Sequence, residues 1–75
     1  MTLDEIELDV PVRVLGFAGI GDVDKIRLTG LGLRPGVSVT KILRTPLRDP
    51  VECLVGAQLL AIEARLLAQI RVEVE

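Results

Sequence analysis

The sequence lacks the side chains on which most enzyme active sites depend. It contains no His, Trp or Tyr, and Ser38, Cys53 and Phe17 are the single residues of their types. Neither a Ser-His-Asp nor a Cys-His site can be built without an imidazole to take the proton of the nucleophile. One thiol without an imidazole also excludes a tetrahedral zinc site, and a lone cysteine cannot form an internal disulfide. The sequence therefore predicts no catalytic residue, no metal site and no cofactor.

Long apolar runs and an excess of positive charge are missing as well. The longest uncharged stretch, 53–62, is about half of the roughly 20 residues that cross a bilayer. A net charge of -2 and a pI near 5.0 provide no basic field for nucleic acid phosphates. The acidic start has no basic region of the kind found in a signal peptide. We expect a cytoplasmic protein that neither binds nucleic acid nor inserts into a membrane.

The apolar residues that are present suffice for one small domain. They make up 49% of the 75 residues, with 27% charged, which is a globular composition. A chain of this length supports one hydrophobic core. Four acidic residues mark 1–9 as a solvated N-terminal segment, and we expect 10–75 to form the folded domain. The four are Asp4, Glu5, Glu7 and Asp9.

Glycine and proline divide the sequence into pieces of about five to ten residues, the spacing of short strands. We expect a first short helix from Asp22, with Val23 and Ile26 along one side, and a second over 63–69. Alternating apolar residues predict five strands, over 10–17, 37–44, 51–55, 58–62 and 70–75. These elements favour a mainly β fold, a small five-stranded antiparallel barrel with two short helices.

A tight hairpin fixes the register of the two central strands. Gly56 and Ala57 fit a two-residue loop, which places Leu54 directly opposite Leu59. Cys53 then faces inward as a small core residue, whereas the two leucines face outward together. The alternative is that the second helix folds across the hairpin and buries the two leucines inside the monomer.

Two candidate interaction surfaces follow from this pattern. Paired exposed leucines mark a site for self-association or partner docking. Leu43 joins them if Lys41 marks a bulge that reverses the alternation, and Leu66 on the second helix extends or covers the patch. The segment 25–48 has six basic residues and no acidic one, which fits a docking face for an acidic protein or an ordinary solvated face. The candidate interface residues are Leu54, Leu59, Leu43, Leu66, Arg34, Arg44 and Arg48.

Two linked motifs lie in the middle of the chain. The stretch LTGLGLRPG over 28–36 is followed ten residues later by PLRDP over 46–50. Pro35 and Gly36 fit the centre of a type II turn. This pattern resembles the ferrous iron transport protein A (FeoA-like) family across residues 10–75. The motif residues are Leu28, Leu31, Gly32, Leu33, Pro35, Gly36, Pro46, Leu47, Asp49 and Pro50.

The resemblance implies a single FeoA-like domain over 1–75 with an SH3-like barrel and no enzyme activity. It further implies a cytoplasmic accessory protein of ferrous iron uptake that docks on a membrane ferrous-iron transporter carrying a cytoplasmic GTPase domain. The alternative is the related SH3-like domain of iron-dependent transcriptional repressors, which contributes dimer or partner contacts. A third interpretation is stimulation of the GTPase in trans by Arg34, Arg44 or Arg48.

The chain departs from the family pattern at two positions that bear on the fold. Arg48 stands where the family usually has glycine, so this turn is less free to adopt a positive φ. Lys41 stands where the family generally has an inward apolar residue. That substitution indicates a local bulge or a side chain that reaches the end of the barrel.

Overall fold

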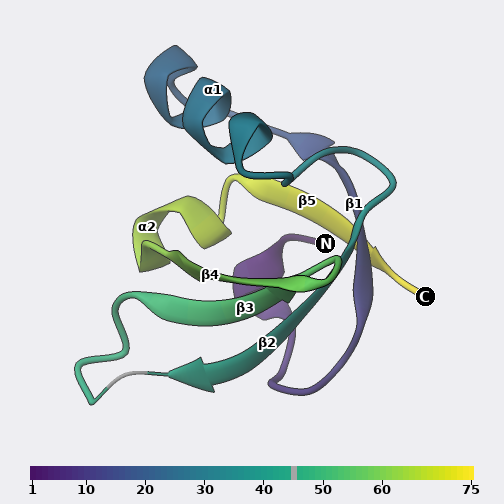
Figure 1. Cartoon of the computed structure of the whole chain (residues 1–75), viewed down its shortest axis with the longest axis vertical. Helices are drawn as coiled ribbons and strands as arrows, with labels where there is room; N and C mark the ends of the chain where they lie inside the picture. Colours follow the sequence, from purple (N-terminus) through teal and green to yellow (C-terminus); the bar gives the residue numbers. More distant parts are fainter. Residues whose placement is uncertain (45) are drawn as a thin grey trace.

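Strands dominate the structure, as the sequence predicts (Figure 1). The computed structural model describes residues 1–44 and 46–75, with the side chains of all of these except Leu43 and Arg44. The two α-helices and five strands differ from the predicted ones only at their ends, and the 3₁₀ turn near the N-terminus was not predicted. The elements are the 3₁₀ turn η1 (Leu3–Glu5), β1 (Val12–Phe17), α1 (Asp22–Gly30), β2 (Ser38–Arg44), β3 (Val51–Val55), β4 (Gln58–Ile62), α2 (Ala64–Leu67) and β5 (Ile70–Val74).

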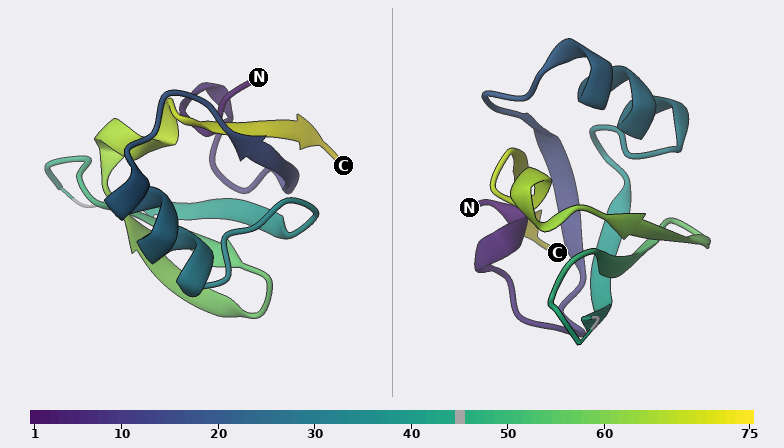
Figure 2. Two further views of the ribbon diagram at one scale, coloured as in Figure 1. Left: turned by 90° about the horizontal axis from the view of Figure 1, so that it is seen from above. Right: turned by 90° about the vertical axis from the view of Figure 1, so that its left-hand side faces the viewer.

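The strands form one antiparallel sheet in the order β4-β3-β2-β1-β5, which curls around a single core (Figure 1 and Figure 2). Alternate residues of each strand face inward, because successive side chains of a strand point to opposite faces. The core therefore draws on every strand and on η1, α1 and α2. Its fully buried apolar residues include Leu3, Val12, Val14, Leu28, Leu33, Val39, Cys53, Ile62, Leu66, Ile70 and Val72.

The N-terminal segment is part of this core, which corrects the expectation of a solvated segment. Leu3 and Ile6 are buried, although the acidic side chains between and after them are exposed. A capping box at Thr2 and Glu5 holds η1, with the Thr2 N–H donating to Glu5 Oε1 at 2.8 Å. The Val72 N–H donates to the Met1 carbonyl at 2.9 Å, so the segment also covers part of β5.

The helix α1 stands outside the curled sheet (Figure 2). Its N-cap is Gly21, one residue before the predicted Asp22. Val23 and Ile26 do share one side of the helix, but that side faces solvent, with 81% and 72% of these residues exposed. Leu28 is the buried residue of α1, so the helix attaches through the opposite side. Among the described residues, neither helix is long and apolar enough to cross a membrane.

Each of the two linked motifs contains a turn in which one residue, Gly36 or Arg48, has a positive φ. The Val37 N–H donates to the Arg34 carbonyl at 3.1 Å and Gly36 has a φ of 92°, which confirms the type II turn at Pro35 and Gly36. Arg48 has a φ of 60°. This left-handed conformation is the one that glycine adopts most readily, so Arg48 occupies it at a cost.

A bulge interrupts the pairing of β2 with β3, as Lys41 indicates. Lys41 stands opposite Cys53, and the register shifts before Leu43, which stands opposite Glu52. The Lys41 side chain does not reach solvent at the end of the barrel, because only 1% of this residue is exposed. The shift moves Leu43 into the row of the outward residues Glu52 and Ala61.

Candidate interaction surface

Leu54 and Leu59, from here on the leucine pair, lie side by side on the outer face of the β3–β4 hairpin. The register places them directly opposite each other, and they are 38% and 62% exposed. Gly56, with a φ of 59°, opens the two-residue loop that sets this register. Thr40 of β2 stands opposite Leu54, so the row continues onto a third strand. The predicted outward pair is confirmed, and α2 does not cover it.

Leu66 does not belong to this surface, contrary to the sequence-based expectation. Its side chain is fully buried, because α2 turns Leu66 and Leu67 toward the core beside η1. Leu43 has the backbone register of an outward residue, but its side chain lies outside the described part of the chain. The structure therefore retains the leucine pair as the apolar part of the candidate surface.

The basic residues of the segment 25–48 do not form one face. Lys41 is buried and Arg27 is ion-paired. Arg34 precedes β2 at the end of β3 that carries the hairpin loop, where the Gly56 N–H donates to the Ser38 carbonyl. Arg48 precedes the opposite end of β3. Arg34 and Arg48, which are both exposed, thus flank the hairpin from its two ends, and the side chain of Arg44 lies outside the description.

The solvent-facing side of α1 carries a pocket of about 600 Å³ that sequence reasoning missed. Within it, Arg34 Nε donates to the Thr29 carbonyl at 3.1 Å, which holds the guanidinium at the C-terminal end of the helix. The lining residues are Asp22, Lys25, Ile26, Thr29, Gly30 and Arg34.

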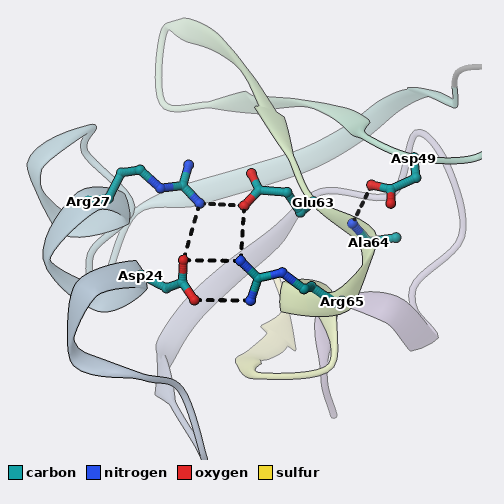
Figure 3. Close-up of polar contacts among 6 residues, drawn as sticks. All are labelled: Asp24, Arg27, Asp49, Glu63, Ala64 and Arg65. Atoms are coloured by element: carbon teal, nitrogen blue, oxygen red, sulfur yellow. Dashed lines mark hydrogen bonds and ion pairs between the residues drawn. The ribbon is translucent and has the colours of Figure 1, made fainter.

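Four charged side chains tie α1 to the junction between β4 and α2 (Figure 3). Arg65 donates to both carboxylate oxygens of Asp24, at 3.0 and 3.3 Å, and Arg27 donates to Glu63 Oε2 at 2.5 Å. The Arg65 guanidinium lowers the pKa of Asp24, and Asp24 raises the pKa of Arg65. Exposed pairs of this kind contribute little stability each. The cluster joins α1 to that junction, and no local sequence signal links residues so far apart in the chain.

The Cys53 thiol and the Lys41 side chain are both buried in the core. Cys53 and Lys41 oppose each other inside the barrel, and burial raises the pKa of the Cys53 thiol to about 11. The thiol therefore stays protonated at neutral pH, out of reach of solvent, which confirms Cys53 as a core residue. Over 1–44 and 46–75, no three or more His, Cys, Asp or Glu side chains come together to hold a metal ion.

The structure is thus a small curled five-stranded barrel with an exposed apolar pair on its outer face. The sequence matches the FeoA domain over residues 1–74. The chain belongs to the FeoA family, as its linked motifs predict, and the match includes the N-terminal segment that those motifs left out. No curated protein matches the sequence.

Solved structures share the fold. Iron(II) transport protein A from Clostridium thermocellum is 30% identical with a TM-score of 0.85, over 99% of this chain and 45% of that one. This chain thus spans less than half the length of that relative. Stenotrophomonas maltophilia FeoA, crystallised with zinc, is 25% identical with a TM-score of 0.80, over 97% and 89% of the two chains. That protein is described as a prokaryotic SH3 domain protein, which confirms the SH3-like fold, and is suggested to act as a ferrous iron transport activating factor.

A further solved structure shares the fold at lower identity. The crystal structure of T. acidophilum IdeR is 21% identical with a TM-score of 0.85, over 100% of this chain and 34% of that one. At this level of identity the likeness shows the fold alone.

Proposed function

We propose that this chain is a non-enzymatic accessory protein of ferrous iron uptake that works in the cytoplasm. In this proposal it docks on the cytoplasmic part of a membrane ferrous-iron transporter that has a GTPase domain. The observation that carries the proposal is the match to the FeoA domain across residues 1–74. The activating role suggested for the S. maltophilia protein supports it. The repressor alternative rests on a likeness of fold alone and is not proposed.

The proposed docking surface is centred on the leucine pair. Two aliphatic side chains exposed side by side offer an apolar centre, and Arg34 and Arg48 flank the hairpin at its two ends. An apolar centre with a charged rim is the usual anatomy of a protein interface. Leu43 belongs to the proposal through its register position in β2, opposite the outward residue Glu52. Arg44 stands opposite the buried Val51, so its register position gives it no place on this surface.

The test is a titration of this protein into the purified cytoplasmic GTPase domain of the transporter, followed by calorimetry and by GTP turnover. We expect saturable binding with unchanged turnover. Leu54→Glu combined with Leu59→Lys should abolish binding, because the change places charges in the apolar centre without altering the net charge. The matched control is Leu15→Glu with Val74→Lys, which alters two exposed apolar residues of β1 and β5 in the same way.

Two outcomes would contradict the proposal. Absence of binding by the wild-type chain removes the accessory role on this partner. Faster GTP turnover contradicts the non-enzymatic part, and loss of that stimulation in Arg34→Ala or Arg48→Ala would assign it to an arginine acting in trans.

A further inference from the structure

The strand β4 is an edge of the sheet, and its register decides which of its main-chain groups face outward. Val55 and Gln58 flank the two-residue loop, so they form a hydrogen-bonded pair. The next pair, Leu54 and Leu59, is therefore a non-hydrogen-bonded one. In an antiparallel ladder these two kinds of pair alternate. The N–H and C=O groups of Leu59 and Ala61 consequently point away from β3, toward the open edge.

Nothing in the described part of the chain occupies this edge. No group outside the β3–β4 ladder hydrogen-bonds to the main chain of Leu59 or Ala61. Both residues are exposed, which shows that the edge is accessible. Natural sheet edges are usually protected by a charge, a proline, a bulge or a covering segment. The sequence of β4, QLLAI, has neither charge nor proline, and its register with β3 is uninterrupted.

We propose that a second copy of this chain pairs with this edge, β4 against β4, antiparallel about a two-fold axis at Leu60. The axis places Leu59 opposite Ala61 of the partner subunit, and the two residues exchange a reciprocal pair of main-chain hydrogen bonds on each side of the axis. A leucine then meets an alanine, so that a large side chain faces a small one. No charge opposes a like charge, because β4 carries none.

The features of β4 favour a second copy over an unrelated strand. A strand that pairs with itself about a two-fold axis brings every charge near its own copy, so an uncharged edge suits self-pairing. The sheets of the two copies then form one continuous sheet, in which residues that oppose each other across the axis share a face. The leucine pairs of the two copies lie on this common outer face. The inference needs only this chain, so it stands or fails independently of docking on a transporter.

The main test compares two substitutions at Ala61. Ala61→Pro removes the outward N–H without touching the bonds that join β4 to β3, and proline is tolerated at such edge positions. Ala61→Ser is the matched control, because serine keeps the main-chain N–H and has a side chain of similar size. In sedimentation equilibrium we expect a concentration-dependent dimer for the wild type and Ala61→Ser. Ala61→Pro should weaken it about tenfold or more, because the symmetry removes two hydrogen bonds at once.

Amide exchange adds a readout that a merely structural effect would not give. Protection of the Leu59 and Ala61 amides should rise with protein concentration in the wild type. The Leu60 and Ile62 amides, which bond to β3, should be protected at every concentration. Ala61→Pro leaves both leucines in place, so its binding to a transporter domain should be unchanged.

A charge exchange tests the register even if Ala61→Pro fails to fold. Leu59→Lys alone should weaken the dimer, and adding Ala61→Glu should restore it, because the axis brings the two new charges together across the interface. A strictly monomeric wild type, dimers unaffected by both substitutions, or open-ended oligomers would each overturn the proposal.

Discussion

The two edges of the sheet are treated differently in this molecule. At β5 the N-terminal segment lies along the strand, with the Met1 carbonyl bonded to the Val72 N–H and Thr2 bridged to Arg71. At β4 the outward main chain of Leu59 and Ala61 has no such cover in the described structure. An uncovered edge invites another strand. The comparison indicates that the N-terminal segment of this chain closes the β5 edge and that the β4 edge is left available for association.

The largest expected effect comes from weakening the cover of β5. The N-terminal segment that covers β5 contributes the fully buried Leu3, so Leu3→Ala removes apolar contacts and leaves a cavity. We expect a loss of about 2–5 kcal/mol in the free energy of unfolding. Urea unfolding measures it, with Leu8→Ala as a control in the same segment, because Leu8 is exposed. Equal losses in the two variants would mean that the N-terminal segment is not an integral part of the core.

An intermediate effect is expected at the hairpin that carries the open edge. Leu54→Glu with Leu59→Lys should change the free energy of unfolding of the monomer by less than about 1 kcal/mol, because both side chains are on the surface. Thermal unfolding at low protein concentration measures this. A fall comparable to that of Leu3→Ala would place the leucine pair in the core and remove it from any interface.

The smallest effect is a pH dependence confined to the covered edge. The Thr2 N–H bonded to the Glu5 carboxylate lowers the pKa of Glu5 from its ordinary value of 4.5. The carboxylate therefore stabilises the fold above that value, and the contribution is lost as the pH falls through the lower folded pKa. The melting temperature of the wild type should exceed that of Glu5→Gln near pH 6, and the difference should vanish near pH 2.

The control for this pH series is Glu7→Gln, which leaves the capping box at Thr2 intact. The same dependence in both variants would show that the acidic segment acts through its overall charge and that the capping box has no separate role.

Local signals predicted a large part of the structure. Gly56 and Ala57 allow one tight loop, and this loop set the register that exposes the leucine pair. The unexpected charge of Lys41 indicated a bulge, which the structure contains. Such features depend on neighbouring residues alone. For the same reason the linked motifs were sufficient to identify the FeoA family.

Features that depend on distant partners were missed. Leu3 and Ile6 stand among acidic residues, so no period marks them as core, and β5 and α2 decide their burial. Val23 and Ile26 have helical spacing, but α1 attaches to the core through Leu28, which leaves the side that carries Val23 and Ile26 in solvent. Leu66 was open to either assignment, because four residues of α2 are too few to show an amphipathic period.

The partnership of β1 with β5 has a consequence for synthesis on the ribosome. Val12 pairs with Val74, and the Met1 carbonyl bonds to Val72, so residues that leave the exit tunnel before β5 depend on β5 for part of their contacts. Contacts of such sequence separation form late and slowly. Nascent chains arrested before residue 70 should remain sensitive to protease, and resistance should appear once 70–74 have left the tunnel. Until then Leu3 and Val12, which the fold buries, lack the strand that helps to cover them, and exposed apolar surface of this kind favours association of incompletely folded chains.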